Sequence, residues 1–167
     1  MSFYEAVVPA YLQMLNSVTG LLTKAEAHCA ARKIDPSVLL GSRLFPDMLP
    51  LSRQIQLVSD YPTRGCARLT HSEVPSTPDT ETSFAELKQR LAKTIDYVKS
   101  FKPEQFEGAD AKDVTFPIGP GKTITMTGQQ FLSSFSLPNL YFHAAIAHGI
   151  LRHNGVEIGK RDFLGAN

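Results

Sequence analysis

Three histidines recur at five-residue intervals near the C-terminal end of the sequence, at His143, His148 and His153. Each residue of an α-helix advances by about 100°, so an interval of five turns the side chain by about 140°. The three histidines therefore lie on different sides of one helix and cannot bind a single metal ion together. His143 shares its face with Asn139, four residues earlier, and with the apolar Ile146. We expect a functional site on this face.

Further polar side chains lie at the start of a predicted second helix and just after Pro138 in a predicted fourth helix. If these ends meet, their carboxylate, guanidinium, amide, phenol and imidazole groups would orient a small polar or anionic ligand. The candidate ligand-binding residues are Tyr11, Asp47, Arg53, Gln54, Asn139 and His143. An imidazole with a pKa near neutrality also suits a general base. No nucleophile paired with a base and no phosphate-binding loop is present, so no catalytic residue is assigned.

The same residues also have a structural interpretation. Asp47 would cap the second helix, and Arg53 would pair with Asp47 or with a loop carbonyl. Asn139 would satisfy backbone groups that Pro138 leaves without a partner.

Composition predicts one soluble domain over residues 1–167. The 43% hydrophobic content supports a sizeable core. A net charge of +1 gives no electrostatic reason to expect nucleic acid or a membrane surface as a partner. The start of the chain lacks a basic signal-peptide region, and no apolar run approaches the ~18 residues of a membrane span, so we predict a cytoplasmic protein. Cys29 and Cys66 are expected to be reduced, partly buried thiols.

Apolar residues spaced by three and four predict four helices, over residues 3–25, 48–69, 84–98 and 128–153. Capping-box pairs precede three of them: Ser2 with Glu5, Ser83 with Glu86, and Thr127 with Gln130. Asp47 is the predicted N-cap of the second helix, and proline should kink the second helix at Pro62 and interrupt the fourth at Pro138. Gly155 suits the left-handed position after the fourth helix. The outer face of the third helix is expected to be solvated; it carries Lys88, Arg90 and Lys93.

Two connections restrict the path of the chain. Residues 71–82 are polar and contain prolines, so they should be extended, and twelve such residues span roughly 35 to 40 Å. That length would join two parallel helices. Residues 114–118 and 123–126 alternate around a glycine-proline-glycine turn, which predicts a β-hairpin with irregular pairing at Pro117. The predicted fold is an all-α, up-down-down-up four-helix bundle with a small β-hairpin before its last helix.

Three segments resemble a family of bacterial and fungal proteins of unknown function that is grouped with the DinB/YfiT-like four-helix bundles. The segments are LFPDMLPLSRQIQ at 44–56, LPNLYFH at 137–143 and LRHNGVEIGKRDFL at 151–164. The resemblance covers essentially the whole chain and implies this fold. It also implies a homodimer, which agrees with an aromatic set that spreads around more of the last helix than one core face needs: Phe131, Phe135, Tyr141 and Phe142.

The resemblance raises the question of a metal site. Many members of the wider superfamily hold a divalent metal with a histidine from helix 2 and a His-x-x-x-His pair on helix 4. Here Ala147 stands four residues after His143, and residues 47–69 contain no histidine. A catalytic zinc or nickel ion needs about three protein ligands, so we expect no metal site and no cofactor.

Two functional classes follow. The chain is predicted to be a DinB-like homodimer that binds a small polar ligand near His143 without a metal. The alternative is a diverged metal-dependent or thiol-dependent transferase or hydrolase, as some superfamily members are. Whether the protein is an enzyme is left open.

Overall fold

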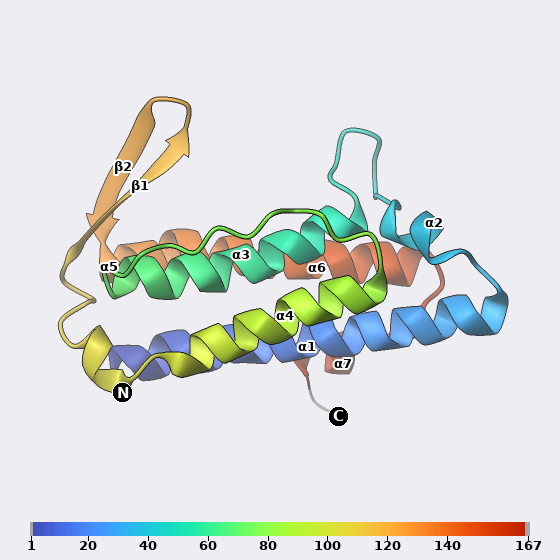
Figure 1. Cartoon of the computed structure of the whole chain (residues 1–167), viewed down its shortest axis with the longest axis horizontal. Coiled ribbons are helices and arrows are strands. Elements are labelled where there is room, and N and C mark those ends of the chain that lie inside the picture. The colour runs from blue at the N-terminus through green and yellow to red at the C-terminus, as the bar shows by residue number, and fades with distance from the viewer. Residues whose placement is uncertain (1, 166–167) are drawn as a thin grey trace.

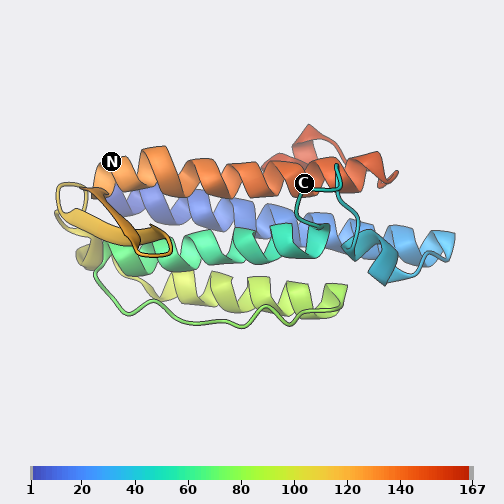
Figure 2. The same cartoon turned by 90° about the horizontal axis from the view of Figure 1, so that it is seen from above.

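The computed structural model describes residues 2–165 and is mostly helical, with one small antiparallel hairpin, as predicted. Four long helices lie side by side (Figures 1 and 2): α1 (Phe3–Arg32), α3 (Leu51–Leu69), α4 (Phe84–Ser100) and α6 (Leu137–His153). Shorter elements are α2 (Pro36–Leu40), the 3-10 turn η1 (Pro103–Phe106), α5 (Gly128–Gln130), the π-helical turn η2 (Phe131–Ser136) and α7 (Lys160–Leu164). The hairpin strands are β1 (Asp113–Gly119) and β2 (Lys122–Thr127). None of the helices in this part of the chain is long and apolar enough to cross a membrane.

The three predicted capping boxes are confirmed, at the N-termini of α1, α4 and α5. Their reciprocal bonds satisfy amide groups that have no partner inside the helix. α1 runs further than predicted, because Cys29 extends its buried stripe by another turn beyond Ala25. It ends at Lys33, whose φ of 55° is left-handed.

The predicted start of the second helix is wrong. α3 begins at Leu51 with Pro50 as its N-cap residue, and Asp47 is exposed in the preceding loop. The proline ring pushes the preceding Leu49 out of the helical region, so a helix cannot run from Asp47 through Pro50. That steric restriction outweighs the capping preference of Asp47.

The predicted fourth helix is divided into α5, η2 and α6, which follow one another without a gap. Pro138 has no N–H to donate, and the turn before it is widened so that the Leu137 amide bonds the Leu132 carbonyl, five residues back. Gly155 follows α6 with a φ of 86°, as predicted.

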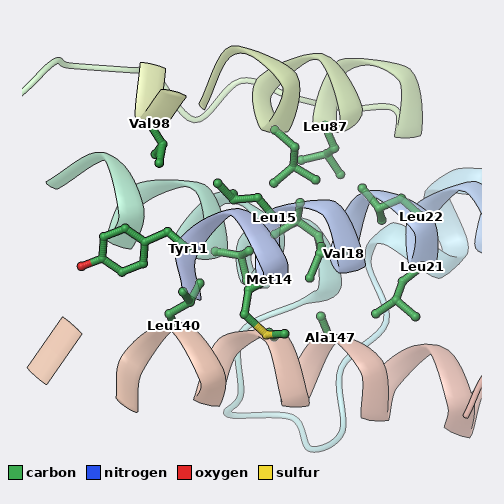
Figure 3. Packing of buried hydrophobic residues seen from close by; sticks show 14 of the residues in the cluster. Tyr11, Met14, Leu15, Val18, Leu21, Leu22, Leu87, Val98, Leu140 and Ala147 are labelled. Atoms are coloured by element: carbon green, nitrogen blue, oxygen red, sulfur yellow. The ribbon is translucent and has the colours of Figure 1, made fainter. Parts of the chain in front are cut away.

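Side chains of α1 form the middle of the core. Figure 3 shows Leu15 and Leu22 among residues facing α4, where Leu87 lies, while Met14 points toward Leu140 of α6. The hairpin packs on the end of the helices through its inward residues, and Phe116 contacts the rings of Phe131 and Phe135 with centroids 5.1 and 4.6 Å away. Its pairing is irregular between Pro117 and Gly119, as predicted.

Tyr11 is a fully buried residue of α1 that requires a glycine opposite it. Its hydroxyl lies 2.6 Å from Oγ of Ser136. A Cβ added to Gly65 of α3 would stand 2.2 Å from the tyrosine oxygen. Gly65 thus allows α3 to approach the Tyr11–Ser136 bond.

We predict that Gly65→Ala lowers the free energy of unfolding by about 1–3 kcal/mol through overpacking, although alanine favours helices. Gly20→Ala is the matched control, because nothing lies within 4 Å of the added Cβ in α1. The free energy of unfolding of the Gly20→Ala control should rise by up to about 1 kcal/mol. Urea unfolding of both variants measures the difference, and equal gains would contradict the requirement for glycine.

The segment between α3 and α4 returns along the outside of these helices, so both begin at the same end of the molecule (Figures 1 and 2). We call residues 71–82 the crossover. They contain neither helix nor strand, as predicted.

A buried ion-pair network fastens the crossover to the helices, and it overturns the prediction of a solvated face at Arg90. The Arg90 side chain is only 3% exposed. Its Nη2 donates to Oδ1 of Asp60 on α3 at 2.6 Å, and its Nη1 donates to Oε1 of Glu81 at 3.1 Å. Nη1 also lies 2.9 Å from Oδ1 of Asp79. Carboxylates of α3 and of the crossover thus compensate the positive charge of Arg90. This compensation allows Arg90 to be buried, although the pattern of its own helix predicts a polar face.

We predict that Arg90→Met lowers the free energy of unfolding by about 3–5 kcal/mol, because Glu81 would remain largely buried without its cation and Asp60 would keep only the partly exposed Arg64. Arg64→Met is the control. Arg64 also bonds Asp60, but its side chain is 44% exposed, so its loss should change stability by less than about 1 kcal/mol. Similar urea midpoints for the two variants would show that Arg90 does not anchor the crossover.

Candidate functional site

His143 faces α3 from α6 and hydrogen-bonds another candidate residue, Gln54 of α3. Its Nδ1 lies 2.8 Å from Oε1 of Gln54, and the two side chains are 8% and 2% exposed. Gln54 uses its amide nitrogen to donate to the Leu49 carbonyl at 3.2 Å, which turns its oxygen toward the histidine. Since that oxygen can only accept, Nδ1 of His143 carries the proton.

The other ring nitrogen of His143 is available to a ligand. Nε2 bonds no residue in the described part of the chain, where the only fully buried side-chain nitrogens or oxygens without a partner are Nε of Arg90 and Nε2 of His148. Nε2 of His143 therefore reaches the surface. In the neutral tautomer that Gln54 fixes, this nitrogen has a free lone pair.

Two aromatic rings flank the imidazole. Tyr61 of α3 stacks on it, with centroids 5.5 Å apart and planes 18° from parallel. Phe142 presents its edge at 5.2 Å and is itself 55% exposed. The stacked contact with Tyr61 and the edge contact with Phe142 hold the plane of the His143 ring.

Burial lowers the pKa of His143, and the positive charge of Arg53 lowers it further. Both effects disfavour the imidazolium ion, so the ring is neutral at pH 7. A neutral, oriented imidazole with one free nitrogen can accept a hydrogen bond or a proton from a bound molecule.

We predict that NMR titration gives His143 a pKa below the ordinary histidine value. Arg53→Met should raise this pKa because it removes one of the two causes, whereas Arg152→Met removes a charge elsewhere on α6 and should not change it. The unfolded chain binds the proton more readily than the folded chain. The free energy of unfolding should therefore fall as the pH drops from about 6.5 toward the lowered pKa. A pKa at or above the ordinary value would contradict the buried, neutral imidazole.

The structure brings together only part of the predicted set. Gln54 and His143 are in direct contact, and Arg53 acts on His143 through its charge. Arg53 does not pair with Asp47 or a loop carbonyl; it pairs with Asp79 of the crossover and donates to Gln56 at 3.1 Å. Asp47 is exposed in the loop before α3, away from the helix start it was predicted to cap.

Tyr11 and Asn139 are used within the fold. The Tyr11 hydroxyl is bonded to Ser136. Asn139 donates its side-chain amide to the Phe135 carbonyl at 2.7 Å, next to the backbone irregularity that Pro138 introduces. This bond to the backbone is the kind of structural role considered for Asn139.

Sequence reasoning missed the aromatic walls. Tyr61 is seven residues after Gln54, two turns along the same helix face, so helical periodicity was a sufficient signal. The other two histidines lie elsewhere. His148 packs against Phe163 of α7, with ring centroids 5.9 Å apart, and His153 is exposed. Residues 2–165 contain no group of three or more His, Cys, Asp or Glu side chains able to hold a metal ion.

Two hollows lie under the crossover rather than beside His143. The larger, of about 440 Å³, is lined by residues of the crossover and α4, including Arg90. The smaller, of about 260 Å³, lies between α3 and residues 74–77. His143 lines neither hollow; its ring contacts Tyr61 and Phe142.

Comparison with known proteins relates the whole described chain to one family. A family model described as a domain of unknown function (DUF1993) matches residues 3–164. The crystal structure of a DinB family member protein from Shewanella denitrificans matches with a TM-score of 0.91 and 41% sequence identity. The match covers 99% of this chain and 93% of that chain. No curated protein matches the sequence. The predicted relationship to an uncharacterised DinB-like family is confirmed.

Proposed function

Because the chain belongs to the DUF1993 family, we propose that it is a DinB-like protein that binds a small polar ligand at Nε2 of His143. We assign it the up-down-down-up four-helix bundle fold, as one domain over residues 1–167. The hydrogen bond between His143 and Gln54 carries the proposal, because it fixes the tautomer that leaves Nε2 as a free acceptor.

The chemistry around His143 limits the ligand. A neutral imidazole nitrogen accepts a hydrogen bond from an O–H, N–H or S–H group. The nearby guanidinium of Arg53 favours a ligand with negative charge. We therefore expect a small anion or polar metabolite that also carries a hydrogen-bond donor.

A thiol-dependent transferase is the second candidate, since a neutral imidazole can take the proton of a thiol on a bound substrate. The protein's own cysteines do not suit that role. Cys66 is buried, which raises its pKa to about 12, and burial also raises the pKa of Cys29. The thiol would come from the substrate.

The superfamily metal does not fit this site. The position that would hold the second ligand of α6 is the buried, apolar Ala147, and α3 has no histidine. With His143 as the single ligand remaining, too few donors are present for a catalytic zinc or nickel ion. The proposed binding therefore uses the imidazole directly.

The ligand proposal predicts a stabilisation that depends on His143. Tag-free protein is screened by thermal shift against reduced glutathione, cysteine, malate and inorganic phosphate. A compound at about 100 times its Kd should raise the Tm by about 5–10 °C. The shift should disappear in His143→Ala and persist in His153→Ala, an exposed residue of the same helix.

Failure of all four compounds to stabilise the wild type would count against ligand binding at His143, as would a shift that survives in His143→Ala. Elemental analysis of the same sample tests the metal separately. About one zinc, nickel or iron per chain, lost in His143→Ala, would replace this proposal with the metal-dependent alternative.

We also propose that the protein is a homodimer. Of the aromatic set on the last helix, Phe131 is buried, but Phe142 is 55% exposed. The loop before α3 adds Phe45, which is 64% exposed, and Leu44, whose Cδ1 would lie 3.7 Å from a Cβ at Gly149 of α6. Loop and helix thus both expose apolar side chains, which a second copy of the chain would cover.

We predict a dimer mass in multi-angle light scattering, and a monomer mass for Phe142→Glu. Val74→Glu places the same charge on the crossover, outside this surface, and should remain dimeric. A monomer mass for the wild type that does not change with concentration would contradict the dimer.

A further inference from the structure

The larger hollow lies between the crossover and α4, on a part of the molecule that the His143 proposal does not use. Its volume of about 440 Å³ falls within the range of small-molecule sites. Six of its lining residues carry the argument: Thr63, Pro75, Pro78, Arg90, Lys93 and Tyr97. Residues of the crossover line one side of it, and Arg90, Lys93 and Tyr97 of α4 line another.

Arg90 is a buried cation with one donor left over. The whole residue is 4% exposed, and its two Nη atoms are paired with Asp60, Asp79 and Glu81. Its Nε has no acceptor among the described residues. Buried guanidinium N–H groups are normally paired, so this donor is an unmet hydrogen bond in a residue that lines the hollow.

The network around Arg90 is balanced in charge. Three arginines face three carboxylates: Arg53, Arg64 and Arg90 against Asp60, Asp79 and Glu81. The Glu86 carboxylate, which also lines the hollow, accepts from the amides of Thr82 and Ser83 in the cap of α4.

Lys93 adds a positive charge to the wall that no carboxylate in the described chain neutralises. It lies three residues after Arg90 on α4, so the two cations are neighbours along one helix face. Lys93 forms none of the ion pairs found within residues 2–165. The hollow is lined by two cations, Arg90 and Lys93, and by two carboxylates, Glu81 and Glu86, and Lys93 is the cation of this set that forms no ion pair with a described residue.

Three rings contribute apolar surface to the remaining wall, which also contains threonines. Tyr97 is one turn beyond Lys93, and Pro75 and Pro78 face α4 from the crossover. Rings of this kind offer flat surfaces to a hydrocarbon or aromatic group. Thr63 adds a side chain of intermediate exposure from α3.

We propose that this hollow is a second binding site, which takes a small carboxylic acid with an apolar body. The carboxylate lies toward Lys93 and Arg90, and the body packs against Tyr97 and the two prolines. Charge-assisted bonds give the anion its orientation, and the apolar contacts provide most of the buried area.

The probe that tests the site is 4-phenylbutyrate, followed by amide NMR shifts of the full-length protein. The amides that move should include Thr77, Lys93 and Tyr97, in a saturable manner. Lys93→Met should weaken binding about tenfold, the effect of losing one charge-assisted contact. Lys99→Met removes a charge from the last turn of α4, outside the hollow, and should bind like the wild type.

Two further comparisons test whether the charge of the ligand matters and whether the site is separate from His143. The neutral 4-phenylbutanamide should bind about tenfold more weakly than the acid. His143→Ala should bind the acid like the wild type, so this site and the one at His143 can fail independently. The proposal is overturned if no saturable shifts appear at these amides below roughly 10 mM probe. It is also overturned if Lys93→Met, with a native spectrum, binds like Lys99→Met.

Discussion

The buried guanidinium of Arg90 joins three segments that the chain would otherwise leave separate. Two parallel helices cannot be connected by a tight turn, so the crossover has to run back along α3 and α4 (Figure 2). Ordering each residue of such a segment costs about 1–2 kcal/mol in backbone entropy. Burial lowers the pKa of Arg90, but its hydrogen bonds with Asp60 and Glu81 raise it by more, so the cation stays charged and holds the crossover. The position of α4 beside α3 depends on the same contacts, together with the buried bond between Ser59 and Thr94 at 2.7 Å.

Local chemistry explains which parts of the fold could be predicted from sequence. A capping box is complete within four residues, so Ser83 and Glu86 identify the start of α4 without any knowledge of the rest. The start of α3 was missed because two local rules conflict there, and the proline restriction at Leu49 is stronger than the preference of Asp47 for a cap. The hairpin followed from alternation and glycine, both of which act over a few residues.

The ion pairs could not be predicted in the same way. Asp60 and Arg90 are thirty residues apart, and periodicity tells only which helix face a residue occupies, not what lies opposite. From the pattern of its own helix, Arg90 therefore looks like an ordinary surface residue. It is buried because the crossover covers it. By contrast, the sequence indicates that His143 and Gln54 could meet, because both residues lie on helix faces that the apolar pattern turns inward. The hollow under the crossover has no local signature, since its walls come from a helix and from a segment without regular structure.

Arg53 connects the two proposed sites physically. Its guanidinium pairs with Asp79 of the crossover, and its charge lowers the pKa of His143 on the other side of α3. One side chain thus both fastens the crossover, which lines the hollow, and contributes to the neutral state of the imidazole.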